Sequence, residues 1–178
     1  MRYNFFGATA SYNTELPVYF SASIHTLQIL GMNGFPHRYT TQAHAEMEGS
    51  VKISSNGLPT LSTAPPAEFG GPGDEWSPET LLMAAVADCF VLSFRAIAQA
   101  SQLSWQHLDC HVEGSLNQIE QAVRFTELII TAKLYINVDS DTRKVKRLLE
   151  KAKQTCFITN SLVAESRLEA EVVFTRIP

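Results

Sequence analysis

The sequence has few cysteines and no closely spaced pair of them. Cys89, Cys110 and Cys156 are widely separated in a chain of 178 residues. An odd number at such spacing is unlike the disulfide framework of a small secreted domain, and without a CxxC pair no zinc site is expected. We therefore expect reduced thiols in a cytoplasmic protein that carries no metal and no cofactor.

Charge is also sparse. Charged residues make up 18% of the chain, the net charge is −4, and the pI is about 5.7, so no basic surface for nucleic acid is expected. Met1 is not followed by a basic stretch and an apolar run, which argues against a secretory signal. The most apolar window, 81–100, contains Asp88 and Arg95, so we interpret it as a buried helix and expect no membrane span.

The apolar content of 45% supports one packed domain, which we place at 39–178. Residues 1–38 differ, because aromatic residues are frequent there and prolines and glycines interrupt the pattern. A short strand or a helical turn fits 18–30. We interpret 1–38 as an N-terminal arm that packs on the domain or on a partner.

The pattern along the domain predicts an α+β fold. Asn56-Gly57 indicates a hairpin turn, the breaker-rich stretch 63–77 indicates a loop, and Ser77, Pro78 and Glu79 are typical of a helix start. The expected strands are 43–53, 58–62, 103–116, 123–138 and 167–176, and the expected helices are 78–100 and 141–155. This order predicts a strongly curved antiparallel sheet, with a long central helix that is covered on most sides and a second helix.

The three thiols invite different interpretations. Cys89 lies mid-helix among small residues, which fits a buried core thiol as well as an active one. Cys110 alternates in phase with Leu108 and Val112 on a strand and is predicted to be structural. Cys156 ends the second helix, where the dipole disfavours a thiolate, so a resolving role would suit it better than attack.

Two segments resemble motifs of one family. Residues 77–90, SPETLLMAAVADCF, are similar to the central-helix motif of the OsmC/Ohr family, the osmotically inducible and organic hydroperoxide resistance proteins. Residues 156–161, CFITNS, resemble the second-cysteine motif of that family. Glu79 stands ten residues before Cys89, as in the family pattern. The element order matches too, and the resemblance covers roughly 39–176.

The resemblance implies an intertwined homodimer with two active sites at the subunit interface. It also implies the reduction of organic hydroperoxides at the expense of a thiol reductant. Cys89 would be the peroxidatic thiol, Cys156 the resolving thiol, and Glu79 a polar support residue. Attack on the O–O bond would give a sulfenic acid, which a second thiol condenses to a disulfide.

Helix geometry restricts the role of Glu79. Ten residues span ~15 Å of a continuous helix, and the side chains of Glu79 and Cys89 leave on different faces. If Glu79 serves a thiol site, we expect it to be that of the partner subunit. The alternative is a helix-start residue favoured by the dipole.

The sequence departs from the family pattern in its cations. The peroxidases of the family place an arginine near the reactive thiol, in the first strand or in the loop before the helix, and neither segment has one here. Arg38 is the better substitute, since Arg95 lies ~9 Å along the helix from Cys89 and points away from it. Phe157 also replaces the usual proline after the second cysteine.

Without a nearby cation Cys89 has little reason to be a thiolate, because burial raises the pKa of a thiol. This leaves an alternative function, a small-molecule-binding or redox-sensing dimer that uses the interface pocket. Phe69 and Trp76, in the loop before the long helix, would either line an apolar pocket over Cys89, as a lipophilic peroxide would need, or pin the loop. The basic residues of the second helix are interpreted as a solvated face.

Overall fold

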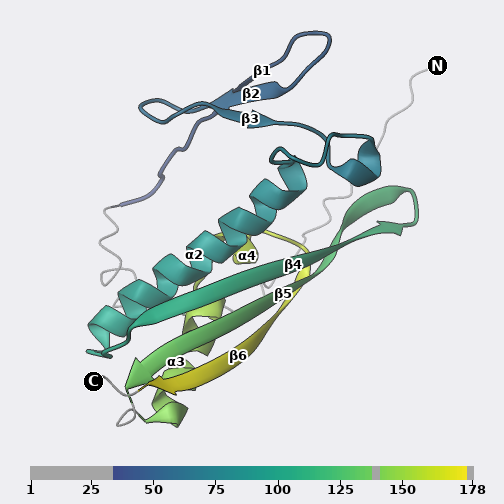
Figure 1. Ribbon diagram of the computed structural model, residues 1–178. Coiled ribbons are helices and arrows are strands. Elements are labelled where there is room, and N and C mark those ends of the chain that lie inside the picture. Colours follow the sequence, from purple (N-terminus) through teal and green to yellow (C-terminus); the bar gives the residue numbers. More distant parts are fainter. Residues whose placement is uncertain (1–33, 138–140, 176–178) are drawn as a thin grey trace, which may run out of the picture. The chain divides into compact units, whose positions relative to one another are not determined.

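The computed structural model describes residues 34–137 and 141–175 (Figure 1). The predicted element at 18–30 and nearly all of the predicted N-terminal arm lie outside these residues. The described part contains two three-stranded sheets, ordered β1-β2-β3 and β4-β5-β6, together with the long helix α2 and the helices α3 and α4.

The small sheet is antiparallel and consists of β1 (Gln42–His44), β2 (Val51–Ser54) and β3 (Leu61–Thr63). The single strand predicted over 43–53 is therefore wrong, because the chain reverses within it. Gly49 takes a φ of +93° in that reversal, a conformation that glycine adopts without steric cost. The predicted hairpin at Asn56-Gly57 is confirmed, since β2 and β3 pair on either side of it.

Helix α2 (Pro78–Ala100) begins and ends where the sequence predicted. Ser77 and Thr80 form a capping box: the Thr80 N–H donates to Ser77 Oγ at 3.2 Å, and the Ser77 N–H donates to Thr80 Oγ1 at 2.9 Å. The helix is also long and apolar enough to cross a membrane, a test that core helices of soluble proteins pass as well.

The prediction that α2 is covered on most sides is wrong for the described chain. Only six of its 23 residues are buried: Val86, Phe90, Ser93, Phe94, Ile97 and Ala98. Leu92, on another face, is 48% exposed. The helix therefore presents an apolar face that the described residues leave uncovered.

The large sheet consists of β4 (His107–Ile119), β5 (Ala122–Asn137) and β6 (Glu165–Thr175). β4 and β5 form the predicted antiparallel hairpin, which bends near a register shift at Ser115/Leu116 (Figure 1). β6, however, runs parallel to β5, so the prediction of an antiparallel sheet is wrong for this pair. α3 (Thr142–Gln154) and α4 (Phe157–Asn160) form a crossover, which carries the chain back to the end of the sheet where β5 starts.

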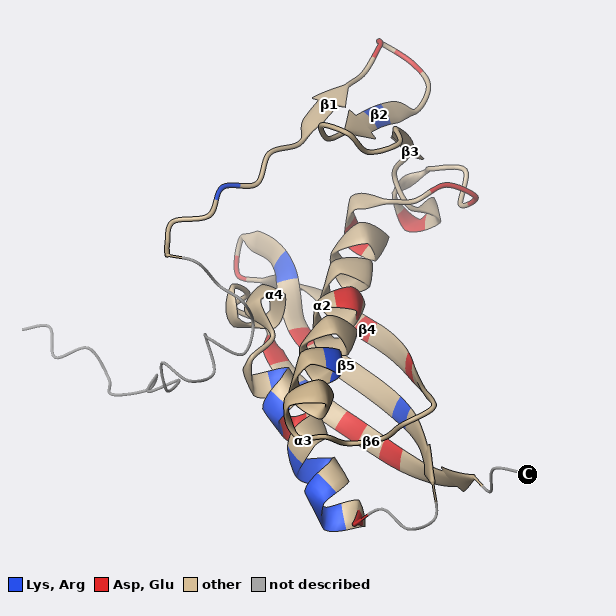
Figure 2. Cartoon of the chain, turned by 90° about the vertical axis from the view of Figure 1, so that its left-hand side faces the viewer, with Lys and Arg blue, Asp and Glu red and all other residues tan. Residues whose placement is uncertain are grey.

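The core lies between one face of the large sheet and the helices. From Leu128 onward, every second residue of β5 is completely buried: Leu128, Ile130, Ala132, Leu134 and Ile136. These side chains pack with Phe90 and Phe94 of α2. α3 contributes a narrow apolar stripe to the same core, while its opposite face carries Lys and Arg (Figure 2).

Candidate functional site

Cys89 and Cys156 meet where α2 contacts α4. Cys89 lies in the middle of α2 and is half-buried, whereas Cys156 is completely buried and is the N-cap residue of α4. Both are free thiols, and they lie close enough for each to shift the pKa of the other. The two cysteines that the sequence singled out as a pair are therefore in contact, while their catalytic roles stay a prediction.

Hydrogen-bond donors surround the sulfur of Cys89. The Cys156 thiol is the strongest of them, followed by the backbone N–H groups of Ile158 and Phe157 and then by Ser93. Against the opposing effect of partial burial, these donors lower the pKa of the Cys89 thiol to about 6. Without a nearby cation, Cys89 was expected to stay protonated. This expectation is wrong, because neutral hydrogen-bond donors stabilise the thiolate in place of an arginine.

Two of these donors come from the start of α4. Phe157 and Ile158 are its first residues, and the first N–H groups of a helix have no partner within it. The N–H groups of Phe157 and Ile158 are therefore available to the Cys89 sulfur, and both lower its pKa. Cys156 was predicted to end the second helix, but α3 ends at Gln154 with Thr155 as its C-cap, and Cys156 is the N-cap of α4.

Cys156 is held as the protonated member of the pair. Its thiol donates to Cys89, and this bond together with burial raises the pKa of Cys156. The buried hydroxyl of Thr159 donates to Cys156 Sγ at 2.9 Å, which acts in the opposite direction by stabilising a thiolate. A chain of hydrogen bonds thus runs from Thr159 through Cys156 to Cys89.

Cys110 lies on β4, away from this pair in the sequence and in its chemistry. Its side chain packs against the core together with Leu108 and Val112, as the alternation predicted. Burial raises the pKa of the Cys110 thiol to about 11. A thiol in this environment is protonated and inert.

Glu79 lies in the first turn of the same continuous helix as Cys89, so the separation of ~15 Å along the axis holds. Its Oε2 atom is buried and has no hydrogen-bond partner among the described residues. Glu79 lines a cavity of about 430 Å³, whose walls are Pro66, Glu68, Phe69, Ser77, Glu79, Thr80, Met83, Gly114, Leu116 and Phe125. The structure does not bring Glu79 to the thiols of its own chain.

The two aromatic residues of the preceding loop lie in different surroundings, and the cavity that one of them lines does not include Cys89. Phe69, in the short 3-10 helix η1 (Ala67–Phe69), lines the cavity at Glu79. Trp76 holds the loop through its backbone, whose carbonyl accepts the Ala64 N–H at 2.9 Å next to a bridge with Thr63, while its side chain is 47% exposed. Neither residue contributes to the pKa of Cys89.

The candidate substitute cations do not join the site. Arg38 and Arg95 are both exposed, and neither forms an ion pair with a residue in the described ranges. Neither contributes to the pKa of Cys89. Within the same ranges, no group of three His, Cys, Asp or Glu side chains is placed to hold a metal ion.

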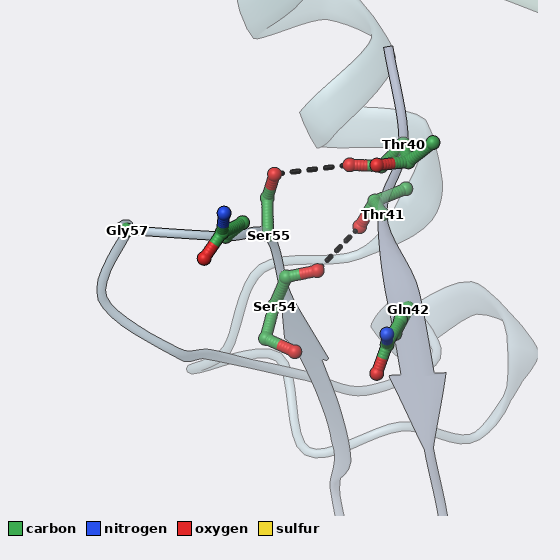
Figure 3. Close-up of a pocket in the computed structure, with 7 residues that line it drawn as sticks. Thr40, Thr41, Gln42, Ser54, Ser55 and Gly57 are labelled. Atoms are coloured by element: carbon green, nitrogen blue, oxygen red, sulfur yellow. Dashed lines mark hydrogen bonds between the residues drawn. The ribbon is translucent and has the colours of Figure 1, made fainter.

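A second depression lies at one edge of the small sheet (Figure 3). It has a volume of about 410 Å³ and is lined by Thr40, Thr41, Gln42, Ser54, Ser55, Asn56 and Gly57. Two of its hydroxyl groups are engaged locally: Thr41 Oγ1 donates to the Ser54 carbonyl at 3.0 Å, and Ser55 Oγ donates to the Thr40 carbonyl at 2.9 Å. Its lining contains no thiol and no charged side chain, so it offers no redox chemistry.

Sequence reasoning missed Ser93, Thr159 and the two N–H groups of α4. Ser93 could have been found, because a residue four positions after Cys89 lies on the same helix face. Thr159 and the N–H groups depend on α4, which is not among the helices expected from the sequence. Without that turn, nothing in the sequence directs donors at Cys89.

The family model described as OsmC-like protein matches residues 71–171, more than half of the chain. The uncharacterized protein YmaD of Bacillus subtilis is 26% identical over 122 residues, which are 67% of this chain and 81% of that protein.

Solved structures share the fold. An organic hydroperoxide resistance protein OsmC from Legionella pneumophila has a TM-score of 0.62 at 24% identity, over 78% of this chain and 98% of that one. An OsmC-like protein of unknown function from Vibrio cholerae reaches a TM-score of 0.69 at 14% identity, over 78% of this chain and all of that one. The family match, together with the same α+β fold, leads to one conclusion: the chain belongs to the OsmC-like family.

Proposed function

We propose that this protein is a thiol peroxidase that reduces organic hydroperoxides through Cys89 and Cys156. The observation that carries the proposal is the polarised thiol pair, in which Cys89 has a lowered pKa and Cys156 holds the proton. Family relatives support the substrate class, since similar structures from Legionella pneumophila and Elizabethkingia anophelis are named organic hydroperoxide resistance proteins.

The pair can carry both chemical steps. The Cys89 thiolate attacks the hydroperoxide, the O–O bond breaks, and Cys89 becomes a sulfenic acid. The leaving alkoxide takes the proton of Cys156 and departs as an alcohol, so that Cys156 is left as a thiolate. Cys156 then attacks the Cys89 sulfur and displaces hydroxide, which is protonated to water, and a disulfide forms.

Thr159 supports the second step. Its hydroxyl donates to Cys156 Sγ at 2.9 Å, and a hydrogen bond to a charged acceptor is stronger than one to a neutral acceptor. The Thr159 bond therefore strengthens when Cys156 loses its proton. An external thiol reductant then returns both cysteines to the reduced state.

We further propose that the protein acts as a cytoplasmic homodimer in which Glu79 serves the thiol pair of the partner subunit. Two observations support this: α2 has an uncovered apolar face, and Glu79 has a buried oxygen without a partner in its own chain. A second subunit would cover the first and could supply a partner for the second.

The cavity at Glu79 favours a second candidate function. Its wall combines Met83, Leu116 and Phe125 with the buried, unpaired carboxylate oxygen of Glu79, as is typical of small-molecule sites. A dimer that binds a ligand there, or senses redox state through the thiol pair, would need no turnover.

Peroxide consumption distinguishes the two functions. With cumene hydroperoxide and dithiothreitol, we expect turnover by the wild type and by Cys110→Ser, and none by Cys89→Ser. Cys156→Ser should consume about one equivalent and then recycle poorly. Wild-type turnover by Cys89→Ser would refute the mechanism, and an inactive wild-type dimer would favour ligand binding.

A further inference from the structure

The cations of the protein are concentrated on one helix. Six of the 14 Lys and Arg residues of the chain lie on the 13 residues of α3, where Glu150 is the single acid. We call these six the α3 ridge: Arg143, Lys144, Lys146, Arg147, Lys151 and Lys153. The chain as a whole has a net charge of −4, so this ridge stands out against an acidic background.

The charges of the α3 ridge are directed to solvent. All six side chains are exposed or half-exposed, and none forms an ion pair with a residue in 34–137 or 141–175. The neutral contact of Lys144, whose Nζ donates to the Ser101 carbonyl at 3.2 Å, leaves its charge uncompensated. The positive charges of the α3 ridge outnumber the single acid of the helix, so they create a positive electrostatic potential that attracts anions.

The ridge leads to the thiol pair. α3 lies antiparallel to the second half of α2: Lys144 at its start contacts Ser101 just after α2, and Cys156 just after its end contacts Cys89. The 13 residues of α3 span ~20 Å between these two contacts. Figure 2 shows the cations along α3, with α4 beyond one end of the helix.

We propose that the α3 ridge docks an acidic protein that carries a dithiol and reduces the Cys89–Cys156 disulfide. This inference rests on the proposed function, which requires an external reductant. The two thiols of the carrier lose two electrons and two protons and become a disulfide, and Cys89 and Cys156 regain both as thiols through a mixed disulfide. A carrier bound to the α3 ridge would lie next to the C-terminal end of α3, where the disulfide forms.

The charge distribution favours a protein carrier over nucleic acid. The outward face of the large sheet carries six acidic residues and two cations, Lys133 and Arg167, so it is negative on balance. The acidic residues are Asp109, Glu113, Glu127, Glu165, Glu169 and Glu171, of which Glu127, Glu169 and Glu171 pair with the two cations. A long polyanion would be repelled by that face and by the net charge of the chain. A folded carrier with a local acidic patch meets the α3 ridge alone.

Synthetic dithiol peptides test the proposal. Two peptides share a Cys-Gly-Pro-Cys centre and differ only in flanking Glu or Gln residues. The full-length protein is oxidised with diamide, so that the disulfide forms without peroxide chemistry. At low ionic strength we expect the Glu peptide to reduce it about tenfold faster than the Gln peptide, and added salt to remove the advantage.

Matched double variants locate the effect. Arg147→Gln/Lys151→Gln removes two exposed charges from the ridge, while Lys52→Gln/Arg124→Gln removes two exposed charges elsewhere. We expect the first pair to slow the Glu peptide about three- to tenfold without slowing the Gln peptide, and the second pair to change neither rate as much. Gln is a good helix former, so α3 should persist.

Three results would overturn the inference: equal rates for the two peptides, an advantage that survives in the ridge variant, or tighter binding of single-stranded DNA than of the Glu peptide. Binding of a Glu peptide with serines in place of cysteines is measured in parallel by fluorescence anisotropy. Ridge-dependent binding without peroxide turnover would refute the proposed function and leave the docking surface standing.

Discussion

Cys89 on α2 and Cys110 on β4 are both half-buried thiols, yet their acidities shift in opposite directions. The pKa of Cys89 is lowered to about 6, whereas burial raises that of Cys110 to about 11. Both thiols experience burial, which by itself disfavours a thiolate. The difference therefore lies in the hydrogen-bond donors that surround each sulfur.

Secondary structure explains which donors are free. The backbone N–H groups around Cys110 belong to a strand that is paired with β5, and Cys110 itself lies opposite Ala132 in this ladder. The first N–H groups of α4 have no partner within their helix and are available to Cys89. A short helix packed against a longer one thus lowers the pKa of Cys89, whereas Cys110 on the edge strand β4 has no donor that offsets the effect of burial.

Of the changes considered, removing the thiol of Cys156 should raise the pKa of Cys89 the most and bring it closest to that of Cys110. In Cys156→Ala the largest cause of the lowered pKa is lost, so the pKa of Cys89 should rise toward its ordinary value of 9.0. At pH 7 a thiol with a pKa of 6 is about nine-tenths thiolate, and one with a pKa of 9 about one-hundredth. We expect alkylation at neutral pH to slow about three- to sixfold, because the ~90-fold loss of thiolate is partly offset by the ~16- to 30-fold greater nucleophilicity of a more basic thiolate.

Iodoacetamide kinetics across pH in a Cys110→Ser background measure this shift. In the parent, reactivity should be lost as the pH falls through about 6, because the thiolate is protonated there. In Cys156→Ala the same loss should occur at a higher pH. An unchanged pH profile of alkylation in Cys156→Ala would mean that Cys156 is not the main donor to Cys89. The contrast with Cys110 would then need another explanation.

Loss of the Thr159 hydroxyl should slow disulfide formation between Cys89 and Cys156 without slowing the attack of Cys89 on the hydroperoxide. Thr159→Val keeps the shape of the side chain but removes the hydroxyl that donates to Cys156 Sγ. Loss of a hydrogen bond to a thiolate costs about 1.5 kcal/mol or more, which corresponds to about tenfold in rate. We expect disulfide formation to slow by that factor after one equivalent of hydroperoxide, while alkylation of Cys89 changes little.

Thr159→Ser is the matched variant, since it keeps the hydroxyl, and it should retain most of the rate. The Val variant should also shift the pH profile of disulfide formation upward, because the pKa of Cys156 rises when its donor is lost. Equal rates for the Val and Ser variants would show that Thr159 only fills space.

Sequence patterns were most reliable where local chemistry decides the structure. Ser77 and Pro78 fixed the start of α2, and the hairpin at Asn56-Gly57 formed as predicted. The parallel pairing of β6 with β5 could not be predicted in the same way, because strand direction depends on the path of the crossover and not on the pattern within either strand.

The candidate site likewise has features that local sequence predicts and features that only tertiary packing decides. Cys89 and Cys156 could be paired from the motifs that contain them, and the ~15 Å separation from Glu79 follows from helix geometry. The acidity of Cys89 could not be predicted, because it depends on backbone N–H groups, which every residue but proline carries. Only tertiary packing decides that those of Phe157 and Ile158 reach Cys89.

The smallest expected effect concerns Ser93, one helical turn after Cys89. Its contribution to the pKa of Cys89 is the least of the four donors, so Ser93→Ala should raise this pKa less than Cys156→Ala does. Near pH 6 the thiolate fraction is most sensitive, and we expect alkylation there to slow about two- to threefold. Ser101→Ala, at the end of the same helix, is the control and should leave the profile unchanged. If Ser93→Ala shifted the profile as far as Cys156→Ala, the ranking of donors would be wrong, and the side chain within α2 would matter more than the turn that packs against it.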